Sequence, residues 1–307
     1  MVDLYIVLGI IAGLLWGFSV YMDKNWVMNN TDSDILITTY TIVLSPFLVA
    51  PFIFTEYVSI PGLTGMFYAT IYGAVYSIGL YFYVLSLRQT EASIVSPLFR
   101  LTPVFTIIFA VLFLRQILTL QQYIGITLVI IGVFIVSLSK ANFSSTFSSG
   151  ENYDLIVAVV YAVISVIVFS FGNILLEFAV QHSHYYTVFY WSRWGGLLPL
   201  LLLLPLPMVR KPLVDFVLSP FENGGISLTV TKFIEVVGSL FYVIAVGLGP
   251  VSVVTTLAAL ESVFVVLIAS IAGYFSFNGI ESLSRRETIV RGISAVIVVV
   301  GVGVISM

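Results

Sequence analysis

Long apolar stretches alternate with short polar connections along the whole chain. A membrane-spanning helix needs about 20 mainly apolar residues. Ten stretches reach roughly that length: Leu4–Met22, Asp34–Thr55, Gly65–Leu87, Ala92–Leu114, Leu118–Leu138, Tyr153–Ala179, Tyr185–Leu204, Ile226–Leu248, Val251–Gly273 and Thr288–Ser306. They exceed the roughly 10-residue strands of a membrane barrel. In lipid the backbone N–H and C=O groups must also form their hydrogen bonds within the protein, which a helix achieves within one segment. We therefore predict an all-α integral membrane protein with ten transmembrane helices, the first of which is retained.

The composition supports this prediction. Of the 307 residues, 60% are hydrophobic and 9% are charged, whereas an average soluble domain has about 25% charged residues. The net charge of −3 gives no reason to expect a nucleic-acid partner. The chain has no cysteine, which excludes disulfides, thiolate metal sites and thiol nucleophiles. We expect no metal and no cofactor.

The two halves of the chain match weakly but in the same order. An offset of 159 residues aligns Gly79 with Gly238 and Phe105 with Phe264. We predict a first five-helix repeat at 1–140, a linker at 141–152 and a second five-helix repeat at 153–307. Because five is odd, the second repeat enters the membrane from the other side. Such a 5+5 inverted repeat is typical of secondary transporters, whose substrate site lies near the midplane between the repeats.

The charges of the connections predict an orientation. Seven basic residues lie in odd-numbered connections, counted from the N-terminus: Lys24, Arg88, Lys140, Arg210, Lys211, Arg285 and Arg286. The even-numbered connections hold one, Arg115. Cytoplasmic connections are enriched in Lys and Arg. We therefore expect cytoplasmic odd-numbered connections and both termini outside.

Several motifs resemble those of the drug/metabolite transporter superfamily, in particular its EamA-type exporters. They are Trp16-Gly17 with Lys24, then Gln89-Thr90-Glu91-Ala92-Ser93 leading to Pro97 and Thr102-Pro103-Val104-Phe105, then Leu118-Thr119-Leu120-Gln121-Gln122-Tyr123-Ile124-Gly125 with Ile131-Gly132-Val133. The resemblance covers the whole chain. It implies ten helices in a 5+5 inverted repeat and export of amino acids or related metabolites.

Two features depart from the pattern of that family. Its members usually carry Gly-Glu before the fifth helix, where this chain has Arg115-Gln116, so any role of that glutamate is absent here. Members are also expected to have cytoplasmic termini, whereas the loop charges of this chain favour termini outside.

A few ionisable residues fall inside the predicted spans. A charged residue at the bilayer centre costs about 2.5–3.5 kcal/mol on insertion scales, so these residues must pair or face water. Arg100 and Glu261 lie well inside their spans, and either they bind substrate or they form a bridge that locks the repeats together. Pro97 and Pro103 bracket Arg100 and are predicted to kink that helix toward a cavity.

Other polar residues extend this candidate site along helical stripes. We expect a central cavity lined by Arg100, Glu261, Lys232, Glu235, Tyr242, Tyr76, Tyr83, Trp16, Asn173 and Arg193. Each has a plainer alternative. Lys232 and Glu235, one turn apart, could simply neutralise each other. Arg193 could anchor its helix at the interface. Glu177 and Asp23 could be solvated carboxylates at span ends.

These observations favour a secondary active transporter that moves a small polar or amphipathic metabolite by alternating access. Arg100 would attract a carboxylate or phosphate, and Glu261 an amine or a proton. Glu261, Glu235 and Glu177 are the candidates for proton coupling. The sequence lacks Gly-x-x-x-x-Gly-Lys-Ser/Thr, so direct coupling to ATP is not expected.

Two alternatives stay open. One is an exporter of lipophilic cations or drugs, against which Arg100 argues. The other, from a different class, is a non-transporting receptor or assembly subunit, which predicts no central cavity. An enzyme is not expected, because no nucleophile–base set is present. For the partners we expect a small-molecule substrate and the lipid bilayer, with a homodimer as an option, in the plasma membrane of a prokaryote.

Overall fold

The computed structural model describes residues 3–29, 34–89, 98–138, 152–203, 205, 207, 210, 214, 225–275 and 285–305. Its elements are α1 (Leu4–Asn29), α2 (Asp34–Val49), the 3₁₀ helix η1 (Ala50–Phe54), α3 (Leu63–Gln89), α5 (Thr102–Leu114), α6 (Leu120–Leu138), α8 (Asn152–His182), α9 (Tyr185–Gly195), α10 (Leu197–Leu203), α12 (Gly225–Leu248), α13 (Val251–Ala258), α14 (Glu261–Phe275) and α15 (Arg285–Ile305). No strand occurs among these residues. The all-helical prediction is confirmed.

Most predicted spans correspond to a helix, but some are interrupted. The stretch Tyr185–Leu204 forms α9 and α10, which meet at Gly196. The stretch Val251–Gly273 forms α13 and α14, separated by a turn at Ala259 and Leu260. In the stretch Ala92–Leu114, a turn at Arg100 and Leu101 precedes α5. Apolar composition alone does not show where a helix breaks.

Four described segments have the length and apolar composition to cross a membrane: Leu4–Asp23, Leu63–Gln89, Leu155–His182 and Leu228–Leu248. Shorter apolar helices accompany them. Large apolar side chains cover the outer surface, among them Leu202 and Ile117, which are 81% and 93% exposed. Lipid is the solvent that such a surface requires.

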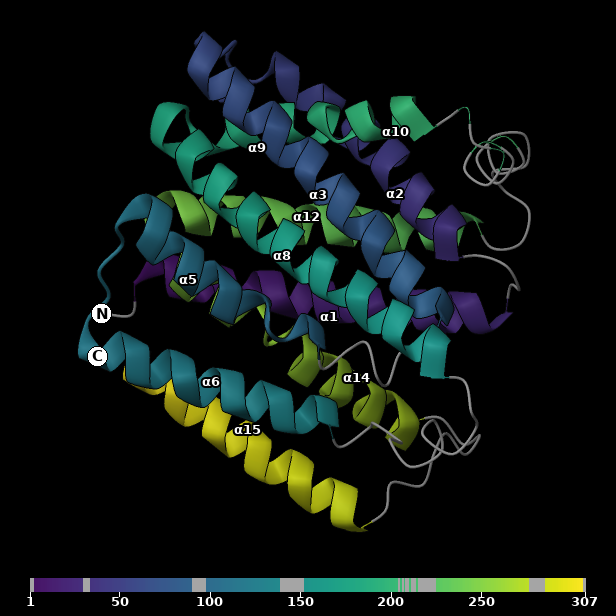
Figure 1. The fold of residues 1–307 in the computed structure, drawn as a ribbon, viewed down its shortest axis with the longest axis vertical. Coiled ribbons are helices and arrows are strands. Elements are labelled where there is room, and N and C mark those ends of the chain that lie inside the picture. The colour runs from purple at the N-terminus through teal and green to yellow at the C-terminus, as the bar shows by residue number, and fades with distance from the viewer. Residues whose placement is uncertain are drawn as a thin grey trace.

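The helices pair across the two halves of the chain. In the centre of the molecule α1 packs along α12, and α3 packs along α8 (Figure 1). The helices α6 and α15 form a pair at one edge, while α2, α9 and α10 lie at the opposite edge (Figure 1). Both chain ends lie at the same end of the bundle (Figure 1).

Small residues allow these helices to approach closely. A Cβ atom on Gly125 of α6 would lie 2.7 Å from the carbonyl oxygen of Gly301 on α15. A Cβ on Gly17 of α1 would lie 2.9 Å from the carbonyl oxygen of Glu261. Without a hydrophobic drive between helices in lipid, such backbone contacts supply much of the packing energy.

The connection before α6, where the sequence departs from the family pattern, keeps the shape of a glycine turn. Arg115 ends α5 in the left-handed region, at φ 51°, which glycine adopts more readily than other residues. The side-chain oxygen of Gln116 accepts a hydrogen bond from the Ser252 hydroxyl. Gln116 therefore ties this connection to α13.

Candidate functional site

A central cavity of about 310 Å³ lies among the helices of both halves. It is lined by Trp16, Ser19, Val20, Asp23, Thr38, Thr41, Tyr72, Tyr76, Leu80, Tyr83, Phe99, Arg100, Thr102, Pro103, Phe169, Asn173, Lys232, Glu235, Tyr242, Thr255, Ala258, Ala259 and Glu261. Nine of the ten residues expected at a substrate site line it, and Arg193 does not. Stripes on separate helices do therefore converge on one space.

The lining residues of α1 and α2 lie toward one end of the bundle. Those on α1 run from Trp16 to Asp23, in its second half, and Thr38 lies near the start of α2. The cavity thus reaches from the middle of the bundle toward the end that lies away from the two chain ends (Figure 1). Toward the chain ends, Tyr68 stacks on Phe178 at 5.3 Å between ring centroids.

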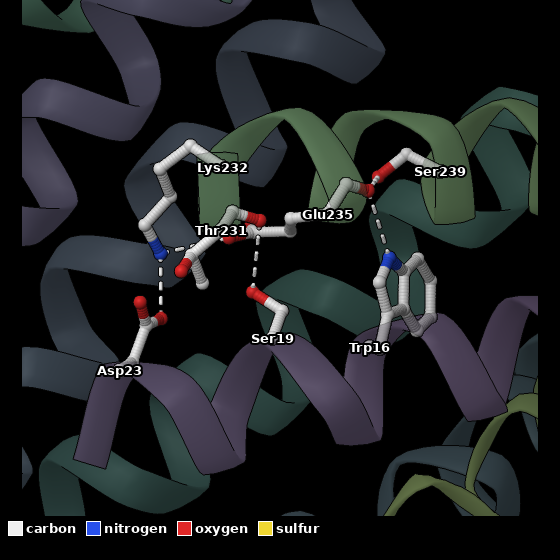
Figure 2. Close-up of polar contacts among 7 residues, drawn as sticks. All are labelled: Trp16, Ser19, Asp23, Thr231, Lys232, Glu235 and Ser239. Atoms are coloured by element: carbon white, nitrogen blue, oxygen red, sulfur yellow. Dashed lines mark hydrogen bonds and ion pairs between the residues drawn. The ribbon is translucent and has the colours of Figure 1, made fainter. Parts of the chain in front are cut away.

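A lysine held by two carboxylates forms one wall of the cavity. The ammonium of Lys232 donates to Asp23 Oδ2 at 2.6 Å and to Glu235 Oε2 at 2.8 Å. The Lys232 side chain is 4% exposed. Figure 2 shows Lys232 reaching from α12 to Asp23 on α1. We call Asp23, Lys232 and Glu235 the lysine cluster.

Backbone contacts hold α1 and α12 together beside this cluster. The Trp16 indole N–H donates to the carbonyl oxygen of Glu235 at 3.2 Å, and the Ser19 hydroxyl to that of Thr231 at 3.5 Å (Figure 2). The Ser239 hydroxyl donates to the same Glu235 carbonyl at 3.0 Å. These hydrogen bonds fix the distance between α1 and α12, the two helices that carry the lysine cluster.

A looser ion pair lies at the turns between helices. One guanidinium nitrogen of Arg100 lies 3.6 Å from Glu261 Oε1, beyond hydrogen-bonding distance, and the two side chains are 14% and 22% exposed. Arg100 Nε is buried and has no hydrogen-bond partner among the described residues. Arg100 and Glu261 form an ion pair, as the alternative of a bridge between the repeats predicted, but they also line the cavity. Both retain capacity to bind a ligand.

The two turns that present this pair have the same backbone pattern. Leu101 N–H donates to Leu98 O at 3.0 Å, and Leu260 N–H donates to Leu257 O at 3.1 Å. The bonds from Phe105 to Leu101 and from Phe264 to Leu260 also correspond. Each pair of equivalent residues is offset by 159 positions. At equivalent sites the first turn carries Arg100 and Thr102, and the second carries Ala259 and Glu261.

Near Pro103 the predicted kink takes the form of a turn that precedes α5. Pro103 lies in the first turn of α5, where its missing N–H leaves no bond unmade. The chain is thus interrupted before Pro103, at Arg100 and Leu101, and no kink follows within α5. Pro97 lies outside the described residues.

Aromatic and amide groups complete the cavity. The Tyr242 hydroxyl donates to Asn173 Oδ1 at 3.0 Å and lies 2.8 Å from Thr255 Oγ1. The rings of Trp16 and Tyr242 are 5.2 Å apart. Tyr83 packs edge-on against Phe99, with centroids 4.4 Å apart, and Tyr76 packs against Phe169 at 5.3 Å. These walls can pack against the apolar part of a small ligand.

Two predicted residues lie outside the central cavity. Arg193 borders a smaller cavity of about 20 Å³ between α2, α3 and α9. Glu177 accepts from Gln181 Nε2 at 3.3 Å near the end of α8, and it does not line the central cavity. Among the described residues, no three His, Cys, Asp or Glu side chains are grouped as metal ligands.

For Asp23 the sequence left two interpretations open, a place on the cavity face or a solvated carboxylate at a span end. Trp16, Ser19 and Asp23 share one helical stripe, which favours the first. The apolar stretch ends at Met22, but α1 continues to Asn29, so Asp23 lies inside the helix and lines the cavity. Thr38, Thr41 and Thr102 also line the cavity without having been expected there.

Known proteins agree with this fold. The sequence model of the EamA-like transporter family matches residues 3–138. An uncharacterized protein of Methanocaldococcus jannaschii is 30% identical over 139 residues, which cover 45% of this chain and 99% of that protein. A protein of known crystal structure has 13% sequence identity and a TM-score of 0.63, over 98% of this chain and 96% of its own. That likeness shows a shared fold.

A family match across the first half, a relative covered almost completely, and a fold shared over nearly the whole length all agree with the apolar helices and the central cavity. The chain belongs to the EamA-like transporter family, within the drug/metabolite transporter superfamily, and is a multi-pass integral membrane protein.

Proposed function

We propose that this transporter moves a small metabolite carrying both a positive and a negative group, such as an amino acid or a related compound, by secondary active transport. The observation that carries the proposal is that Arg100 and Glu261 both line one cavity, as a loose pair. A ligand carboxylate or phosphate would bind Arg100, and a ligand amine would bind Glu261.

The size of the cavity supports a small substrate. Ligand pockets are commonly about 300–1,000 Å³, and this cavity of about 310 Å³ is at the low end. Its aromatic walls would hold an apolar side chain, while its charged groups would hold the ends of the molecule. A large amphipathic drug would need a wider space.

A 5+5 inverted repeat is part of the proposal. If α1 corresponds to α8 and α3 to α12, the contact of α1 with α12 has its counterpart in the contact of α8 with α3. The pair of α6 with α15 then maps onto itself. The matched turns near residues 100 and 259 support the same relation, as does a relative about half as long.

Alternating access follows from that symmetry. The cavity extends toward one end of the bundle, and the stacked rings of Tyr68 and Phe178 lie toward the other. Exchanging the conformations of the two repeats would open the opposite end. With odd-numbered connections in the cytoplasm, the described state faces the cytoplasm and would load substrate for export. Location in a prokaryotic plasma membrane and assembly as a homodimer belong to the same proposal.

Proton coupling would use carboxylates that face the cavity. Glu261 and Glu235 do so, whereas Glu177 does not. We therefore favour Glu261 and Glu235. Transport in proteoliposomes should then change when a pH gradient is imposed, and transport that is indifferent to the gradient would exclude coupling.

One observation favours the second candidate function, export of lipophilic cations. The cavity holds three carboxylates, Asp23, Glu235 and Glu261, against the two cations Lys232 and Arg100. Arg100→Ala separates the candidates: it should weaken binding of a zwitterion but strengthen binding of a cation. The third alternative, a receptor or assembly subunit, predicts no central cavity and is disfavoured by this one.

The direct test is a ligand screen on the purified full chain by thermal shift, followed by counterflow in proteoliposomes with the hits. Amino acids and small amino-containing metabolites are expected among the hits, and their counterflow should fall with Arg100→Gln. If only hydrophobic cations stabilise the protein, the proposed substrate class is wrong.

A further inference from the structure

Arg193 is the one charged residue expected at the substrate site that the structure places elsewhere. It borders the small cavity of about 20 Å³, which we call the α9 pocket. Tyr72 and Tyr76 belong to the walls of both this pocket and the central cavity, together with Thr41 and Leu80. The pocket therefore adjoins the transport site without being part of it.

Arg193 has no carboxylate partner among the described residues. No Asp or Glu oxygen lies within 4.0 Å of its guanidinium, and its Nε is buried without a hydrogen bond there. The guanidinium carbon lies 5.0 Å from the centre of the Phe189 ring. A cation–π contact offsets only part of the cost of removing an arginine from water. Arg100 and Lys232, by contrast, each have a carboxylate.

The walls of the α9 pocket offer donors and no acid. They are formed by Thr41, Ile42, Ser45, Tyr72, Gly73, Tyr76, Ser77, Leu80, Ser192, Arg193 and Gly196. Ser77 Oγ makes no hydrogen bond to another described residue, so its proton is available to the pocket. A guanidinium with a nearby hydroxyl is a pair of donors, which is what an anion requires.

Glycines give the pocket its small, fixed size. Gly73 of α3 touches the Ser192 carbonyl, and a Cβ on Gly196 would lie 2.9 Å from Ser77 Oγ. A volume of about 20 Å³ leaves room for a water molecule or a small ion, since a site for one water needs about 10–15 Å³. This small volume favours a halide ion over an amino acid.

We propose that the α9 pocket is a binding site for a monovalent, halide-sized anion such as chloride, held by the guanidinium of Arg193 and the hydroxyl of Ser77. This inference does not rest on the transported substrate. The anion would neutralise a half-buried cation that has no carboxylate partner among the described residues. It would also lie behind Tyr76, which is within electrostatic range of Arg193, Glu235 and Glu261, so its presence would alter the charge balance of the central cavity.

The competing explanation is neutralisation at longer range. The lysine cluster has one carboxylate more than it has cations, and Glu235 and Arg193 both lie within electrostatic range of Tyr76, with opposite charges. In that case the α9 pocket holds water, and halides have no specific effect. The two explanations therefore differ in a measurable quantity.

The test is a halide titration of the full chain, purified in detergent without substrate. Chloride or bromide replaces gluconate at constant sodium concentration, and the melting temperature is followed. A saturable rise is expected for both halides, because a ligand that binds only the folded state stabilises it. Arg193→Gln should raise the half-saturating concentration about tenfold or more, as expected for loss of a charged hydrogen-bond donor.

Arg100→Gln is the matched control, because it makes the same change at an arginine that has a carboxylate partner. It should keep the wild-type half-saturation. The proposal is overturned if the wild type shows no saturable halide effect, if Arg193→Gln behaves like the wild type, or if Arg100→Gln weakens the effect equally.

Two further arms cover folding and ligand identity. If Arg193→Gln yields no folded protein, Ser45→Val decides, because it keeps the cation but fills the pocket; a halide effect that survives it overturns the proposal. Formate tests whether a carboxylate is the preferred anion. Stabilisation by formate with none by chloride or bromide would assign the pocket to a carboxylate and also overturn the proposal.

Discussion

The cavity has two charged clusters that differ in how tightly they are made. In the lysine cluster, contacts of 2.6 and 2.8 Å hold a side chain that is 4% exposed. In the pair of Arg100 and Glu261, the closest atoms are 3.6 Å apart, and the side chains are 14% and 22% exposed. Each cluster joins the two halves of the chain, but they are built for different tasks.

The difference suggests a division of work. A buried charge that has all its partners close at hand has little to gain from a ligand, and it is costly to disturb. A loosely paired charge can exchange its partner for a ligand group at a smaller cost. We therefore expect the lysine cluster to govern the stability of the bundle, and the Arg100–Glu261 pair to govern recognition.

The largest effect is expected from Lys232→Met. It leaves Asp23 and Glu235 without their shared cation, and breaking a buried ion pair from one side costs about 3–5 kcal/mol. The free energy of unfolding in mixed detergent should fall by that amount. Adding Asp23→Asn and Glu235→Gln to Lys232→Met should recover most of the loss. A variant as stable as the wild type would refute the assigned role.

The next effect is on binding. Arg100→Gln should lower the binding affinity for a substrate that has a carboxylate or phosphate. The expected loss is about 10- to 100-fold, the range for loss of a charged hydrogen bond. Its free energy of unfolding should change less than that of Lys232→Met. Calorimetry with a ligand found by screening measures the first quantity, and detergent unfolding the second. If stability falls more than affinity, the comparison between the clusters is reversed.

A smaller effect is expected from Asp23→Asn. The amide oxygen can still accept a hydrogen bond from Lys232, and the substitution removes the carboxylate in excess. We expect the free energy of unfolding to change by no more than about 1 kcal/mol, the net value of one hydrogen bond. A loss as large as that of Lys232→Met would show that Lys232 needs both charges. Glu235→Gln is the matched variant on α12.

The smallest effect is expected from Tyr242→Phe, which lies outside both clusters. It removes a hydroxyl that contacts Asn173 and Thr255 but keeps the ring against Trp16. The cost in unfolding free energy should be about 1 kcal/mol, measured as for the other variants. A larger loss would place Tyr242 among the residues that hold the helices together.

The sequence predicted the helices and most of the charged and aromatic residues that line the cavity, because both depend on local rules. Apolar length finds spans, and a 3.6-residue period puts Lys232, Glu235 and Tyr242 on one face. The sequence could not predict which charged residue each of the others would pair with. Lys232 binds Glu235 on its own helix, as one alternative allowed, but also Asp23, 209 residues away. That pairing depends on the packing of α1 against α12, which no local pattern encodes.

The same limit explains Arg193. An arginine beside aromatic residues looks like an interfacial anchor or a site residue, and the sequence does not distinguish them. The contact of α3 with α9 through Gly73 and Gly195 decides where this side chain lies, because it places Arg193 at the wall of the α9 pocket. Interrupted helices are hidden for a related reason: the turn at Ala259 and Leu260 contains no glycine or proline.

The matched turns give the cavity a direction. Where two identical half-chains assemble about a twofold axis, equivalent turns must present the same side chain, and a bound molecule finds two equal ends. A single chain is free of that constraint. Here Arg100 is equivalent in the repeat to Ala259, and Glu261 is equivalent to Thr102, so the two turns carry different charges. A molecule with unlike ends can therefore dock in one orientation only, so the cavity has a head and a tail.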